Sequence, residues 1–163
     1  MTDLLALLGE FYRDKLAQLL EHQAGARLIG QYDVNNTYQY VINREDVQLS
    51  WIASAIGELG GTISDQAEPD RGAASGTKGR DRARQVLQED RDGAQAFVDR
   101  WAPRVEGMRN ARHARMLRLI LGETLEQKRF FEQALAGQTD LLGRREAQLG
   151  PSHGEVLPTR WIE

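Results

Sequence analysis

The sequence contains no cysteine and no long apolar run. Without cysteine the chain can form no disulfide, no zinc-thiolate site and no thiolate nucleophile. A membrane-spanning helix needs roughly 20 apolar residues, and charged residues interrupt every apolar stretch well before that length. The N-terminus carries an acid, Asp3, where a signal peptide would have basic residues. We therefore expect a soluble, cytoplasmic protein that does not bind membranes.

An excess of charge of one sign is also lacking. The formal net charge is only −3, and acids alternate with arginines over residues 80–82 and 89–92. Such alternation is typical of a solvent-exposed helix face with ion pairs along it. Nucleic-acid binding usually requires a basic stripe, often with aromatic residues among the basic ones. The sequence therefore predicts no nucleic-acid partner.

Two common enzyme signatures are missing. The serines fall mainly in expected loops, which gives a Ser-His-Asp arrangement no support. Residues 76–79, Gly-Thr-Lys-Gly, lack both the preceding strand and the spacing of a phosphate-binding loop. The sequence leaves enzymatic activity open but favours a protein without it.

Four long segments have apolar residues at helical spacing, and no segment alternates as a strand would. We predict helices over residues 3–22, 35–59, 81–105 and 110–136, which makes the fold class all-α. Asp33, Asn35 and Asn36 are candidate N-caps of the second helix, and Gly60-Gly61 is its expected stop. Aromatic residues recur at helical spacing and are interpreted as core or dimer-interface residues.

The connections between the predicted helices differ in length. The first runs over residues 24–34 and the third is a tight turn at Glu106-Gly107, so each should form an antiparallel hairpin. The second, about residues 60–80, is long and is expected to cross the whole bundle. Two hairpins joined by one long crossover is the ferritin-like connectivity. We therefore predict a four-helix bundle over residues 1–136 and a C-terminal tail over residues 137–163.

Several polar residues fall on the apolar faces when each residue is advanced by 100° around its helix. Lys15 and Glu45 lie about equally far from the first hairpin turn, and Asp90 and Glu123 lie about equally far from the second. All four helices thus place a charged residue at one height. Buried charges persist only when they are paired, hydrogen-bonded or bound to metal. The predicted buried polar network is Lys15, Glu45, Asp90, Glu123 and Gln127.

Two segments carry a resemblance to a known family. The first is Arg-Glu-Asp-Val-Gln-Leu-Ser-Trp at residues 44–51, followed by the Leu-Gly-Gly stop at 59–61, and the second is Gly-Glu-Thr-Leu-Glu at residues 122–126, ahead of Phe130-Phe131. On them the chain resembles the ferritin-like superfamily, and within it the rubrerythrin-like proteins. The resemblance implies two iron or manganese ions, held by one glutamate from each of the first and third helices and by Glu-x-x-His from the second and fourth. It extends over roughly the first 136 residues in layout.

The chain departs from that ligand pattern at four positions. Gln48 and Glu126 stand where the family has histidine, Lys15 stands near the place of the first glutamate, and Asp90 is a shorter carboxylate. Two divalent cations need several anionic oxygens and usually imidazole. Lys15 could neutralise Glu45 in place of the metal, or it could extend to the surface along its helix. The implied di-metal site is therefore interpreted as degenerate.

Two hypotheses follow. The favoured one is a structural or binding module that has lost its di-metal chemistry, has no cofactor, and contacts a protein partner or a second copy of itself. The alternative is a carboxylate-bridged iron or manganese protein with oxidase- or peroxidase-like or metal-handling activity. Its ligands would be Glu45, Asp90 and Glu123, completed by Gln48, Glu126 or Gln127. His113 is interpreted as a core residue, and no role is assigned to His22 or His153.

Overall fold

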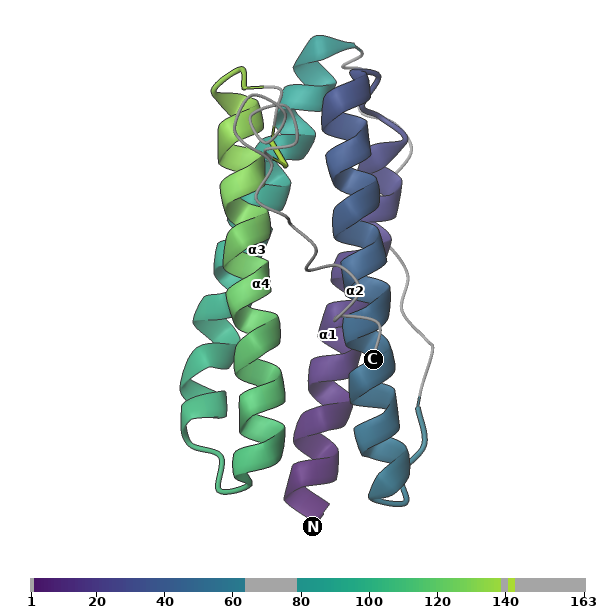
Figure 1. Cartoon of the computed structure of the whole chain (residues 1–163), viewed down its shortest axis with the longest axis vertical. Helices are drawn as coiled ribbons and strands as arrows, with labels where there is room; N and C mark the ends of the chain where they lie inside the picture. The colour runs from purple at the N-terminus through teal and green to yellow at the C-terminus, as the bar shows by residue number, and fades with distance from the viewer. Residues whose placement is uncertain (1, 64–78, 139–140, 143–163) are drawn as a thin grey trace, which may run out of the picture.

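The protein is an all-α bundle of four helices, seen end to end in Figure 1. The computed structural model describes residues 2–63, 79–138 and 141–142. Its helices are α1 (Thr2–Ala26), α2 (Tyr32–Glu58), α3 (Arg80–Glu106) and α4 (Ala111–Leu135). These four elements confirm the predicted fold class. No described helix combines the length and the apolar character that crossing a membrane would require.

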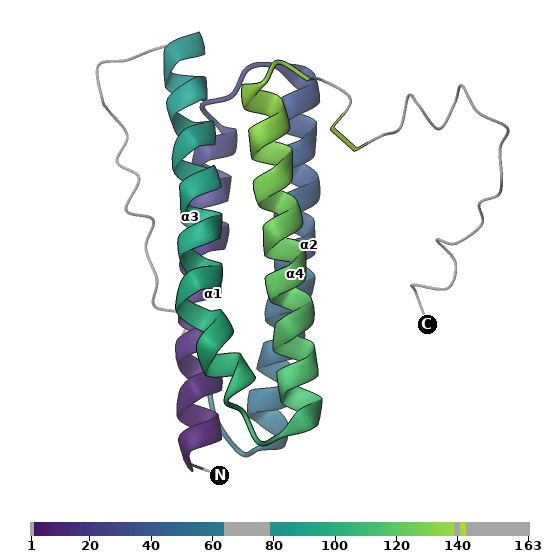
Figure 2. The ribbon, with the colours of Figure 1, turned by 90° about the vertical axis from the view of Figure 1, so that its left-hand side faces the viewer.

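The helices form two antiparallel hairpins packed against each other. α1 pairs with α2 and α3 pairs with α4, while α1 also lies beside α3 and α2 beside α4. Figures 1 and 2 show that α2 ends where α1 begins, whereas α3 begins at the opposite end of the bundle. The connection between Glu58 and Arg80 therefore joins opposite ends of the bundle, as its length predicted. The predicted C-terminal tail lies almost entirely outside the described residues.

The turn between α1 and α2 differs from the prediction. α1 continues to Ala26 instead of ending at His22, and α2 begins at Tyr32 with Gln31 at its N-cap position. The expected N-cap roles of Asp33, Asn35 and Asn36 are wrong, because all three lie inside α2. The side-chain amide of Asn35 instead donates to the carbonyls of Ala26 (2.8 Å) and Ile29 (3.1 Å). Asn35 thus satisfies backbone groups left open at the end of α1.

The predicted stop after α2 is confirmed. Gly60 has a φ of +80°, a conformation that favours glycine. Its N–H donates to the Gly57 carbonyl at 3.0 Å, and the Gly61 N–H donates to the Ile56 carbonyl at 2.9 Å. Glycine at the end of a helix commonly accepts this geometry. The turn leads the chain out of α2 close to α1.

The core consists of apolar side chains from all four helices. Phe11 on α1 is fully buried and packs edge-on against Phe97 and Trp101. Trp51, in contrast, is only partly buried. Between the apolar layers lies a group of buried polar side chains, which is the candidate functional site.

Candidate functional site

Each of the four helices contributes polar side chains to the middle of the bundle. These side chains are almost completely shielded from solvent, although several carry a charge. Because a buried polar group without a partner is costly, their contacts decide what the cluster can do. The buried polar residues of this cluster are Lys15, His22, Glu45, Gln48, Asp90, Thr124 and Gln127.

Glu45 on α2 lies between two basic side chains of α1. Its Oε1 is hydrogen-bonded to His22 Nδ1, and its Oε2 is 3.3 Å from Lys15 Nζ. The second contact is an ion pair without the alignment of a hydrogen bond, since Oε2 has no hydrogen-bond partner. Burial alone would raise the pKa of Glu45, but His22 and Lys15 together hold that pKa below its usual value. Glu45 is therefore a carboxylate whose charge is balanced by its own chain.

Lys15 does not extend to the surface, because its side chain is fully buried. Its ammonium group donates to Gln18 Oε1 at 2.8 Å and to Thr124 Oγ1 at 3.4 Å, and it lies 5.1 Å from the centre of the Phe97 ring. Burial lowers the pKa of Lys15 by more than the charge of Glu45 raises it. Thr124 is held in place by its own bond to the Ile120 carbonyl at 2.8 Å.

His22 connects Glu45 to a second carboxylate. Its Nε2 is 4.0 Å from Asp90 Oδ1, and its ring packs against Phe131 at 5.5 Å between centroids. Burial lowers the pKa of His22, but Glu45 and Asp90 together raise this pKa by more than burial lowers it, so the net shift is upward. Asp90 also accepts a hydrogen bond from the hydroxyl of Tyr38. The imidazole therefore lies between two carboxylates that favour its protonated form.

Glu123 lies at the edge of the cluster, where it is partly exposed. It accepts hydrogen bonds from Arg44 Nε and from Gln48 Nε2, both at 2.8 Å, and Arg44 Nη2 is 2.6 Å away. Glu126 does not reach the cluster: it is 56% exposed and pairs with Arg129 on the outer face of α4. Gln127 is buried, and its Oε1 has no hydrogen-bond partner.

Three residues of this arrangement were not identified from the sequence: His22, Tyr38 as a partner of Asp90, and Arg44. His22 was given no role because it was the last residue of the first predicted helix. It lies seven positions after Lys15, and seven positions are close to two helical turns, so both side chains lie on one face of α1. Both residues lie within the helix predicted over residues 3–22, so this spacing was available from the sequence.

The residues present do not fit the di-metal centre that the resemblance implies. Within residues 2–63, 79–138 and 141–142, no three His, Asp or Glu side chains are placed to share a metal ion. The three carboxylates Glu45, Asp90 and Glu123 instead face three basic groups, Lys15, His22 and Arg44. A divalent cation beside Glu45 would be repelled by the ammonium and imidazolium that already balance its charge.

The burial of the cluster also bears on catalysis. Lys15, His22 and Glu45 are each at most 1% exposed, so no substrate could reach them without opening the bundle. A general acid or base must come within hydrogen-bonding distance of the group that it serves. The arrangement is therefore suited to holding helices together.

No family model, curated protein or solved structure was found to match this chain.

Proposed function

We propose that this protein is a ferritin-like bundle in which an ion-pair network takes the place of the di-metal centre, and that it acts as a binding module. The observation that carries the proposal is the position of Glu45 between Lys15 and His22. In the implied metal site this glutamate would donate its oxygens to metal. Here both oxygens lie beside cations of the same chain.

The energetics of buried charges support this structural role. A buried carboxylate is costly unless its charge and hydrogen-bonding capacity are matched, and losing one partner of a buried pair costs about 3–5 kcal/mol. Basic residues at the centre of the bundle meet this requirement without a metal. Such a network also restricts which side chains can replace its members, independently of any catalytic use.

Exposed apolar side chains on α2 and α4 support the binding part of the proposal. Tyr40 and Val47 on α2 and Leu119 on α4 are large apolar side chains exposed to solvent. The two helices are neighbours in the bundle, and exposed apolar side chains on neighbouring elements are candidates for an interaction surface. We expect a protein partner at this face, either a second copy of the chain or another protein. Sedimentation velocity of the wild type and of Leu119→Lys distinguishes the two.

The proposal is tested by metal content. The full-length protein is purified without chelators, incubated anaerobically with Fe(II) or Mn(II), desalted and submitted to elemental analysis. We expect metal only at the level of the Lys15→Met and Glu45→Ala variants. Roughly two metal ions per chain in the wild type, lost in Glu45→Ala and in Glu123→Ala, would overturn the proposal in favour of a carboxylate-bridged metalloprotein.

A further inference from the structure

A pocket of about 340 Å³ opens between α2 and α4, away from the buried cluster. It lies where α2 ends and α4 begins, and its lining comes from residues 50–58 and 112–116. Ligand pockets in proteins usually measure from about 300 to 1,000 Å³. The size of this pocket therefore fits a small molecule of about one ring with a short side chain.

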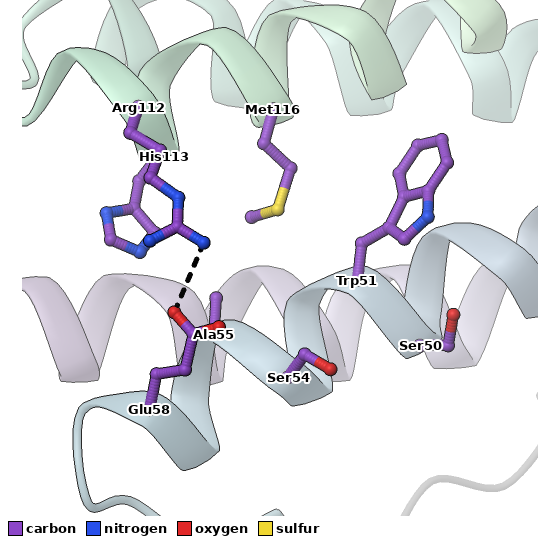
Figure 3. A pocket seen from close by; sticks show the side chains of 8 residues that line it. All are labelled: Ser50, Trp51, Ser54, Ala55, Glu58, Arg112, His113 and Met116. Atoms are coloured by element: carbon purple, nitrogen blue, oxygen red, sulfur yellow. Dashed lines mark ion pairs between the residues drawn. The ribbon is translucent and has the colours of Figure 1, made fainter. Parts of the chain in front are cut away.

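The two ends of the pocket differ in chemistry, as Figure 3 shows. Trp51 lies towards one end and Met116 lies near the middle, so this part offers an indole ring and a thioether, beside the hydroxyls of Ser50 and Ser54. Arg112 and His113 lie towards the other end, together with Glu58. A site that orients a small ligand usually combines apolar side chains with a few polar groups at fixed positions.

The polar end coincides with the N-terminus of α4. Arg112 and His113 are the second and third residues of that helix, whose first turn contains no acid. A helix N-terminus carries a partial positive charge and favours an anion. His113 also lines this end of the pocket and is only 7% exposed. The electrostatics of this end favour a negatively charged group.

Glu58 is the acid at this end, and it is already paired. Its carboxylate is 3.3 Å from the guanidinium of Arg112, and the two side chains are 53% and 77% exposed. An exposed ion pair of this kind contributes little to stability and is easily exchanged. Arg112 can therefore turn from Glu58 to an incoming carboxylate, with which arginine forms well-directed bidentate bonds.

We propose that this pocket binds a small monocarboxylate with an aromatic body. The carboxylate lies at Arg112 and His113 at the start of α4, and the ring packs against Trp51 and Met116. The inference goes beyond the protein-binding function proposed above and does not depend on it, since the pocket shares no residue with the buried ion-pair network.

Three probes with the same ring test the proposal: phenylacetate, phenylacetamide and phenethylamine. Each is titrated into the full-length, 15N-labelled protein at constant ionic strength and followed by 1H–15N correlation spectra. We expect phenylacetate to shift the Trp51 indole signal and the His113 amide signal, and to bind at least tenfold more tightly than the amide. Comparable affinity for acid and amide overturns the proposal, as does absence of binding.

Matched variants locate the site. Arg112→Gln should weaken phenylacetate binding at least fivefold, whereas Arg115→Gln, an exposed arginine of the same helix outside the pocket, should leave it unchanged. An equal loss of phenylacetate affinity in both variants would mean a general charge effect and would overturn the proposal. Tighter binding of phenethylamine than of phenylacetate would also overturn it, in favour of a cation site at Glu58. The metal measurement gives an independent readout, so failure of one proposal is distinguishable from failure of the other.

Discussion

At the scale of single residues, the main feature is a carboxylate that depends on two cations. Glu45 has no access to water and is balanced by Lys15 and His22. Removing it would leave two basic groups in the core with less compensation. The stability of the fold should therefore depend strongly on this one side chain.

Glu45→Ala should lower the free energy of unfolding by about 3–5 kcal/mol, because it leaves buried charge unpaired. Chemical denaturation followed by circular dichroism measures the change. Asp46→Ala is the matched control, since it removes an exposed acid from the neighbouring position. Similar midpoints for both variants would contradict a buried network. The double variant Lys15→Met/Glu45→Leu should recover part of the loss, because neither charge then remains.

Stability should also depend on pH through His22. Its folded-state pKa is raised above the ordinary value of 6.5. The imidazolium therefore contributes stability that is fully present below pH 6.5 and is lost as the pH rises through the folded-state pKa. The free energy of unfolding should fall over this range in the wild type and should fall less in His22→Gln. Parallel pH profiles of the two proteins would exclude a protonated His22.

The acidic side of the profile belongs to Glu45. Its folded-state pKa lies below the ordinary value of 4.5, so its contribution is present above that pH and is lost as the pH falls towards the folded-state value. The network should therefore stabilise the fold most between these two transitions. The contributions of the other titrating groups to the pH dependence largely cancel when each variant is compared with the wild type at the same pH.

At the scale of elements, the two ends of α2 depend on different contacts. The α1–α2 turn is held by Asn35, which bonds to two carbonyls near the end of α1. The opposite end is held by glycines, one of which lies against the side chain of Leu5. Both features can be tested without changing the polar cluster.

Asn35→Ala should cost about 1–3 kcal/mol, because it removes two hydrogen bonds that contribute roughly 0.5–1.5 kcal/mol each. Thermal unfolding provides the measurement. Asn36→Ala is its control, since Asn36 is exposed on the same turn of α2. If the two variants melt at the same temperature, Asn35 does not hold the turn.

Gly61→Ala should destabilise the protein by about 1–3 kcal/mol through overpacking. An added Cβ would lie 2.7 Å from Leu5 Cδ2 and 2.9 Å from Ile56 Cγ2. Gly57→Ala meets no atom within 4 Å and lies inside α2, so it should be neutral or slightly stabilising. Urea denaturation of the pair decides the matter, and equal stability of the two variants would contradict the close contact at Gly61.

At the scale of the whole molecule, the sequence was sufficient to predict the architecture because helical periodicity and loop length are local properties. The 100° spacing placed Lys15, Glu45 and Asp90 on inward faces, and all three side chains are buried. The length of the connection after Gly61 indicated a crossing from one end of the bundle to the other, which the direction of α3 confirms.

What could not be predicted depends on contacts between helices. The sequence does not show that Arg44 reaches Glu123 across the α2–α4 boundary, or that Tyr38 bonds to Asp90 on the other hairpin. It also gives no sign that Glu126 is turned outward to Arg129 until the rotation of α4 is fixed by its packing. The pocket at the start of α4 is likewise formed by residues far apart in sequence.

The polar cluster has a consequence for the alignment of the two hairpins. Apolar side chains at helical spacing can pack almost equally well after one hairpin slides by a turn, about 5.4 Å, along the other. The bonds from Tyr38 to Asp90 and from Gln48 to Glu123 would be broken by such a slide. These two hydrogen bonds therefore fix the axial register of one hairpin relative to the other. Replacing Tyr38, Gln48, Asp90 and Glu123 together by apolar residues should give a bundle that stays helical but shows several sets of backbone amide signals, one for each register.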